Sequence, residues 1–156
     1  MREFGVSNFR PSQITALQRA CPMPLIVQQV EISLLHLDPL EDGTLDHCLA
    51  QRITPMAWSP LGGGGLGDGA RKLLPSQQGY QPAAVNAALD AIARRRGTHR
   101  VAVALAWLLR HPAGITPMVG TTDPARIRQA AEADALDLSR DEWYELLRAA
   151  QGRPLP

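Results

Sequence analysis

The stretch ITPMAWSPLGGG, residues 53–64, joins an apolar run to a chain of glycines. Ile53–Trp58 has the length and composition of a short buried strand, and the glycines after it predict a loop. Leu25–Ile32 is continuous and rich in β-branched residues, as expected of a strand buried on both faces. Two further apolar runs, Phe4–Asn8 and Ile115–Val119, also end in small or polar residues, so we expect four strands.

Helical patterns separate these strands. Alternation of strands and helices implies a parallel sheet with helices packed outside it. No linker divides the chain, so we expect one domain over residues 1–156. The predicted helices carry recognisable start and stop signals: Pro11 with Ile14 and Leu17 on one face, Asp42-Gly43 before Leu45, Cys48 and Leu49, Pro82 to Gly97, Val101–Leu109, Asp123-Pro124, and the capping box Ser139/Glu142.

Size and charge limit the possible classes. The chain has 156 residues and 45% hydrophobic content, enough for one core. It is too short for a complete (β/α)8 barrel, which takes about 250 residues. A net charge of +1 gives no electrostatic reason to expect nucleic acid or an acidic membrane as partner. The apolar runs fall short of the ~20 residues that cross a bilayer, so we expect no membrane segment.

The cysteines indicate the compartment. Cys21 and Cys48 show no paired CxxC spacing, which favours reduced thiols and a cytoplasmic location. His47 adjoins Cys48, but adjacent residues on a helix point about 100° apart and no second pair has ligand spacing. We therefore expect no metal site.

Four motifs follow the predicted strands in a fixed order. They are GVSNF (5–9), QQVE (28–31), AWSPLGGG (57–64) and PMVGTT (117–122), the last leading to Arg126. Together they resemble the nicotinamide-nucleotide site of the aldo/keto reductases, a (β/α)8-barrel family. The resemblance runs nearly from end to end but covers only the C-terminal half of that barrel. It implies an α/β fold of four parallel β/α units plus a C-terminal helix, half of a TIM barrel.

The resemblance implies residues for the nicotinamide end of the cofactor. Ser7 and Asn8 would hold the carboxamide, helped by Gln29, and Trp58 would stack on the ring. The family usually has Asn-Gln where this chain has Gln28-Gln29, so only Gln29 matches. Two alternatives remain open: Ser7 and Asn8 could be a buried polar pair that ties strand to loop, and Trp58 could be a core residue.

The resemblance also implies the phosphate and adenine contacts. The backbone at Ser59, Leu61 and Gly63 would approach the pyrophosphate, since glycine permits close contact. The segment after the fourth strand would read the 2′-phosphate and adenine, which favours NADP over NAD. Many members have a basic residue where this chain has Gly120, and some have an Asn at Ala130, so the preference is expected to be weaker. The residues implied there are Gly120, Thr121, Thr122, Arg126 and Gln129; a flexible glycine loop and simple helix capping are the alternatives.

No catalytic residue is assigned. Aldo/keto reductases use a Tyr supported by Lys, Asp and His, all from the first half of the barrel. This chain has Tyr80, Tyr144 and a single lysine, Lys72, and neither Tyr stands at a strand end beside a lysine. Because a carbonyl needs a proton donor close to its oxygen, the isolated chain is expected not to reduce aldehydes at an enzymatic rate.

Three interpretations follow. The first is a truncated NADP-dependent aldo/keto reductase without its catalytic half, and the second is a non-catalytic nucleotide-binding or regulatory module that acts through a protein partner. The third is a structural half-barrel with a vestigial site. The edges of the half-barrel at Phe4–Asn8 and Ile115–Val119 would be unpaired, which predicts a homodimer or pairing with a missing N-terminal half.

Overall fold

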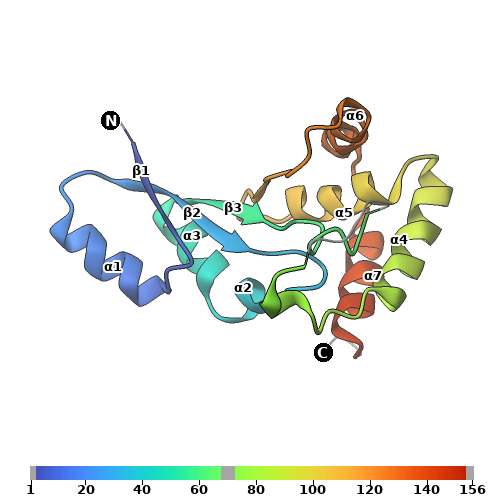
Figure 1. Ribbon diagram of the computed structural model, residues 1–156. Coiled ribbons are helices and arrows are strands. Elements are labelled where there is room, and N and C mark those ends of the chain that lie inside the picture. Colours follow the sequence, from blue (N-terminus) through green and yellow to red (C-terminus); the bar gives the residue numbers. More distant parts are fainter. Residues whose placement is uncertain (1–2, 68–72, 154–156) are drawn as a thin grey trace.

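A computed structural model of the chain describes residues 3–67 and 73–153 (Figure 1). Its strands form one parallel sheet in the order β1-β2-β3-β4, as predicted. The strands are β1 (Phe4–Ser7), β2 (Leu25–Glu31), β3 (Thr54–Trp58) and β4 (Thr116–Pro117). The helices are α1 (Pro11–Ala20), α2 (Asp38–Glu41), α3 (Thr44–Gln51), α4 (Ala83–Arg96), α5 (Arg100–Leu109), α6 (Pro124–Ala131) and α7 (Arg140–Gln151), with 3-10 turns η1 (Pro75–Gln77) and η2 (Glu132–Ala135).

The sheet brings all four strand ends to one edge. Each strand pairs with the next one along the chain, so the segments that follow the strands are neighbours in space. Close pairing of β1 with β2 depends on Gly5, because a Cβ added there would lie only 2.8 Å from the carbonyl oxygen of Val27. The fold is thus four consecutive β/α units with α7 added, which is the predicted half-barrel.

Most of the core lies between the sheet and the helices of the second half of the chain. Figure 1 shows α4, α5 and α7 gathered at one end and β1 with α1 at the other. Helix α5 is buried along nearly its whole length, from Ala102 to Leu108. A smaller cluster under α1 and α3 is formed by Ile14, Leu25, Cys48 and Ile53.

Three sequence expectations were wrong in detail. Strand β2 is less buried than expected, because Ile26, Val27 and Gln29 are only half-buried. Strand β4 is limited to Thr116–Pro117, although the Met118 N–H still donates to the Ala57 carbonyl oxygen at 2.9 Å. Leu17 does not share the burial of Ile14 and is 37% exposed.

The helix signals were more reliable. Asp123 caps α6 by accepting a hydrogen bond from the Ala125 N–H at 2.8 Å, and Ser139 forms the predicted capping box with Glu142. Gly97 ends α4 with φ of +64°, a left-handed conformation that glycine adopts without strain. The short helix α2 was not expected.

Two further properties concern only residues 3–67 and 73–153. No helix within these ranges is long and apolar enough to cross a membrane. Within the same ranges, no three side chains of His, Cys, Asp or Glu lie together in a way that could hold a metal ion.

Candidate functional site

A cavity of about 330 Å³ opens where β3 and β4 end. Its walls come from two segments distant in sequence, the loop that follows β3 and the segment that leads from β4 into α6. This volume falls at the lower end of the range for small-molecule sites. The predicted cofactor residues that line it are Ser59, Leu61, Gly63, Gly120, Thr121, Arg126 and Gln129.

The loop after β3 has an uneven pattern of backbone hydrogen bonds. The N–H groups of Gly62, Gly64 and the residues up to 67 donate to carbonyl oxygens within the loop, at 2.8–3.2 Å. Within the described residues, no acceptor takes the N–H groups of Ser59, Leu61 and Gly63. Unpaired main-chain donors in a concave turn form a typical anion site. These three residues are the ones predicted to bind the pyrophosphate.

Contacts on both sides hold this loop in place. Leu35 packs so closely that a Cβ added to Gly62 would lie 2.6 Å from its Cδ1 atom. On the other side, the Asn86 side-chain amide donates to the Gly65 carbonyl oxygen at 3.0 Å. Gly62 and Gly63 also have φ of +55° and +62°, which favours glycine. The unpaired donors therefore belong to a loop of defined shape.

The segment that leads into α6 places a cation at the other wall. The Thr121 hydroxyl accepts a hydrogen bond from the Asp123 N–H at 3.2 Å. Arg126 is 54% exposed, and its Nε lies 3.7 Å from Asp123 Oδ2. Asp123 thus caps α6 as predicted, whereas the Thr121 hydroxyl bonds only the N–H of that capping residue. Arg126 and Gln129 line the cavity, whereas Thr122 does not.

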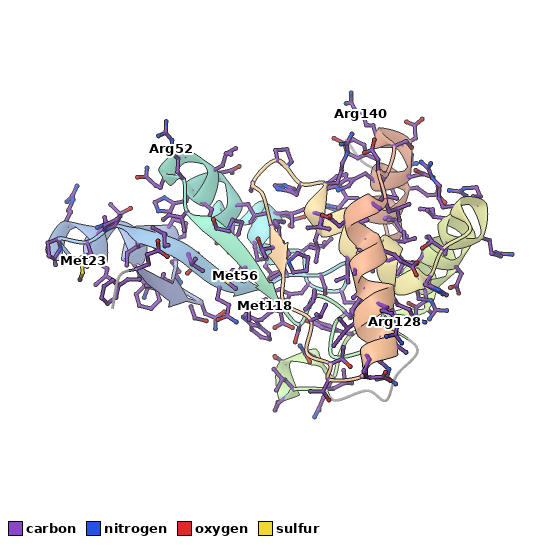
Figure 2. All side chains as sticks on the ribbon, turned by 90° about the horizontal axis from the view of Figure 1, so that it is seen from above. Met23, Arg52, Met56, Met118, Arg128 and Arg140 are labelled. Carbon is purple, nitrogen blue, oxygen red and sulfur yellow. The ribbon has the colours of Figure 1, made fainter. Side chains whose placement is uncertain are left out.

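The residues predicted for the nicotinamide end lie outside this cavity and bond to one another. Ser7 Oγ donates to the Gln29 carbonyl oxygen at 3.2 Å, and the Trp58 indole N–H donates to Asn8 Oδ1 at 3.0 Å. Gln29 Nε2 contacts the sulfur of Met118, which lines the cavity, at 3.2 Å. Figure 2 shows Met118, which follows the edge strand β4, close to Met56 of the neighbouring strand β3. These side chains form a polar row across the strand ends, although Ser7 and Asn8 are exposed rather than buried.

The structure adds a cluster that the sequence analysis missed. Glu31, buried at the end of β2, accepts hydrogen bonds from the Gln77 side-chain amide and from the Tyr80 hydroxyl at 2.9 Å. Burial and the hydrogen bond to Glu31 raise the pKa of Tyr80 above its ordinary value. This cluster fastens the segment around η1 to the sheet. The sequence signal that could have found this cluster is the acidic residue Glu31 at the end of an apolar strand.

No catalytic pair is found among the described residues. Tyr80 is bound to Glu31, and Tyr144 lies in α7 against the edge of the Trp143 ring, 5.1 Å between centroids. Lys72 lies outside the described residues.

Comparison with known proteins gives one consistent family. The model described as "Aldo/keto reductase family" matches residues 1–150. The chain is 44% identical to the "6-dehydroglucose reductase" of Novosphingobium aromaticivorans over all of this chain and 49% of that protein. It is 39% identical to "Oxidoreductase YdhF" of Escherichia coli over all of this chain and 49% of that protein.

Solved structures agree with the sequence comparison. The thermostable aldo-keto reductase Tm1743 superposes with a TM-score of 0.78 at 26% identity, over 95% of this chain and 48% of that one. The aldo-keto reductase AKR2E5 complexed with NADPH superposes at 0.73 and 27% identity, over 93% of this chain and 41% of that one. The chain thus spans about half the length of the relatives it matches.

Proposed function

The chain belongs to the aldo/keto reductase family, and we propose that its part in the family's chemistry is to bind NADP. One observation carries the proposal: Ser59, Leu61 and Gly63 line a cavity, and no described residue accepts from their backbone N–H groups. Three unpaired main-chain donors on one wall fit the oxygens of a pyrophosphate. Arg126 on the opposite wall fits a further phosphate.

The remaining contacts follow the length of the nucleotide. Gly120 and Thr121, which line the cavity, hold the ribose phosphate beside Arg126, and Gln129 contacts the adenine; Thr122 adds a hydroxyl next to them from outside the lining. The carboxamide binds at Ser7, Asn8 and Gln29 by replacing the hydrogen bonds that these side chains make with their neighbours. Trp58 supplies a flat apolar surface for the ring. When bound, NADPH supplies the hydride for reduction of an aldehyde or ketone.

In this proposal the chain binds the cofactor, and the proton donor comes from a residue outside this chain. The sequence places no tyrosine beside a lysine at a strand end, so the chain alone is expected to bind the cofactor without turnover. Strands β1 and β4 each keep one unpaired edge, which fits a second copy or an N-terminal half-barrel. The relatives named 6-dehydroglucose reductase support an aldehyde-bearing sugar as the substrate of the complete barrel. Two cysteines without a disulfide support a cytoplasmic location.

A second candidate is a nucleotide-binding module that acts on a protein partner. The observation that favours it is that predicted cofactor residues gather at a cavity, while the sequence places no tyrosine beside a lysine at a strand end. Both candidates require nucleotide binding and differ in whether a complementary half-barrel brings turnover.

Titration of the 156-residue chain with NADPH, followed by its fluorescence, tests the proposal. We expect a micromolar dissociation constant, which Arg126→Gln raises about ten-fold. Arg128→Gln, on the same helix but not among the residues that line the cavity, is the matched control and is expected to leave the dissociation constant unchanged. Absence of NADPH binding by the unmodified chain would overturn the proposal.

A turnover assay separates the two candidates. Aldehyde reduction is measured with the chain alone and after mixing with the N-terminal half of the Novosphingobium relative. Activity only in the mixture supports the reductase half. NADPH binding with no activity in either case supports the binding module.

A further inference from the structure

The charge on Arg126 is offset by its neighbour Asp123. The ion pair joins Arg126 Nε to Asp123 Oδ2 at 3.7 Å, and both side chains are about half exposed. Asp123 Oδ1 is used differently, since it accepts the Ala125 N–H at 2.8 Å and so caps α6. One carboxylate therefore holds the helix start with one oxygen and faces the guanidinium with the other.

The Asp123 carboxylate lies beside the lining residue Arg126 and is not itself among the described residues that line the cavity. Among the described lining residues, Arg126 is the only charged one; Gly120, Thr121, Gln129 and Ala130 complete that wall. The position before Thr121 is glycine, so it adds no cation. The net charge of Asp123 and Arg126 together is zero, which is a weak site for a phosphate dianion.

We propose that Asp123 is a specificity-determining residue that lowers the discrimination between NADP and NAD. The inference rests on the proposed nucleotide site. A phosphate bound by Arg126 lies within several ångströms of the Asp123 carboxylate, and two like charges at that separation repel each other even in water. A free 2′-hydroxyl carries no charge, so NAD is spared the repulsion. A carboxylate near a ribose also offers an acceptor to that hydroxyl.

Asp123 can be changed without removing the helix cap, because Ser and Asn cap helices as well as Asp does. Asp123→Ser and Asp123→Asn are therefore the variants of choice. The probes are 2′,5′-ADP, which has a 2′-phosphate besides its 5′-phosphate, and 5′-AMP, which lacks only the 2′-phosphate. We expect both variants to bind 2′,5′-ADP about five- to ten-fold more tightly, and 5′-AMP within about two-fold of the unmodified chain. Asp134→Asn removes one charge from η2, away from the cavity, and is the control for net charge.

The dependence of binding on salt concentration is a second measurement, and a purely structural role of Asp123 would not change it. The gain for 2′,5′-ADP is expected to shrink between about 0.05 and about 0.5 M NaCl, because the Debye length falls about three-fold over this range. An unchanged ratio of the two affinities, or an equal change for both probes, would overturn the inference. Failure of the proposed function gives a different result, because neither probe then binds the unmodified chain. That result would also overturn the inference about Asp123.

Discussion

Trp107 and Trp143 each donate the indole N–H to the other's backbone carbonyl oxygen. The Nε1···O distances are 3.2 Å from Trp107 and 3.0 Å from Trp143, and the two rings stack with centroids 5.1 Å apart. Trp107 lies on α5 and Trp143 on α7, so the exchange joins the buried central helix to the last helix of the chain. Trp107 is 1% exposed, which makes these hydrogen bonds costly to lose.

Trp143→Phe is expected to lower the free energy of unfolding by about 1–3 kcal/mol. The substitution removes one N–H donor and leaves the Trp107 carbonyl oxygen without it. Urea denaturation followed by circular dichroism measures the change. Tyr144→Phe is the control, because it alters the adjacent aromatic by one hydroxyl and is expected to cost no more than about 0.5 kcal/mol. Equal losses of unfolding free energy in the two variants would contradict a specific contribution from the hydrogen bonds between Trp107 and Trp143.

Tyr80→Phe is expected to destabilise the chain by about 1–3 kcal/mol, since buried Glu31 then loses one of its two donors. Glu31→Gln in the same background restores part of the loss, because the amide needs fewer donors than a carboxylate. Thermal unfolding of the single and double variants measures both effects. A double variant less stable than Tyr80→Phe would contradict this account.

The raised pKa of Tyr80 gives the stability a dependence on alkaline pH. Burial first, then the hydrogen bond to Glu31, disfavours the phenolate in the folded state. The unfolded chain therefore loses this proton near pH 10 while the folded chain keeps it, and stability falls as pH rises further. Urea midpoints between about pH 9 and 11 should drop, and the drop should be smaller in Tyr80→Phe.

Glu142 gives the opposite dependence in acid. Hydrogen bonds from Arg96, at 2.6 and 2.9 Å, and from Ser139 hold the pKa of Glu142 at about 2, below the ordinary 4.5. Its contribution to stability is complete above pH 4.5 and is lost as the pH falls towards 2. Glu142→Gln should flatten the urea midpoint over this window, whereas Glu3→Gln, at the start of the chain, should not.

The two cysteines are expected to differ in reactivity. Cys48 is 0% exposed, and burial raises the pKa of its thiol to about 11. Because the thiolate is the reactive form, an aromatic disulfide reagent should modify Cys21 first and Cys48 only on unfolding. Cys21→Ser leaves one slow thiol, and rapid labelling of that variant in native buffer would be inconsistent with the packing under α3.

The sequence was a good guide to the fold wherever local chemistry determines the backbone. Proline, glycine and capping side chains act within a few residues, so the starts of α6 and α7 and the end of α4 were correctly predicted. Burial was harder, because it depends on what lies opposite a face. Val27 and Gln29 are in the expected strand, yet they are only half-buried.

The site was predictable as a set of positions and less so as a set of contacts. The cavity gathers the residues after β3 and β4 that the motifs indicated, because parallel strands end at one edge. The bonds of Ser7, Asn8 and Gln29 to their neighbours depend on side-chain orientation, which no motif encodes. Glu31 was missed for a similar reason: its donors, Gln77 and Tyr80, lie more than forty residues along the chain.

The uneven bonding of the loop after β3 matters for protein engineering. Its free donors belong to the main chain at Ser59, Leu61 and Gly63, while its shape comes from bonds among the neighbouring backbone groups and from Leu35 and Asn86. The identity of the side chain at 61 is therefore not part of the anion contact. Because the Leu61 side chain also packs against the hydrophobic core, a library of apolar residues at that position is expected to vary the surface beside the cavity while the donors of the loop stay where they are.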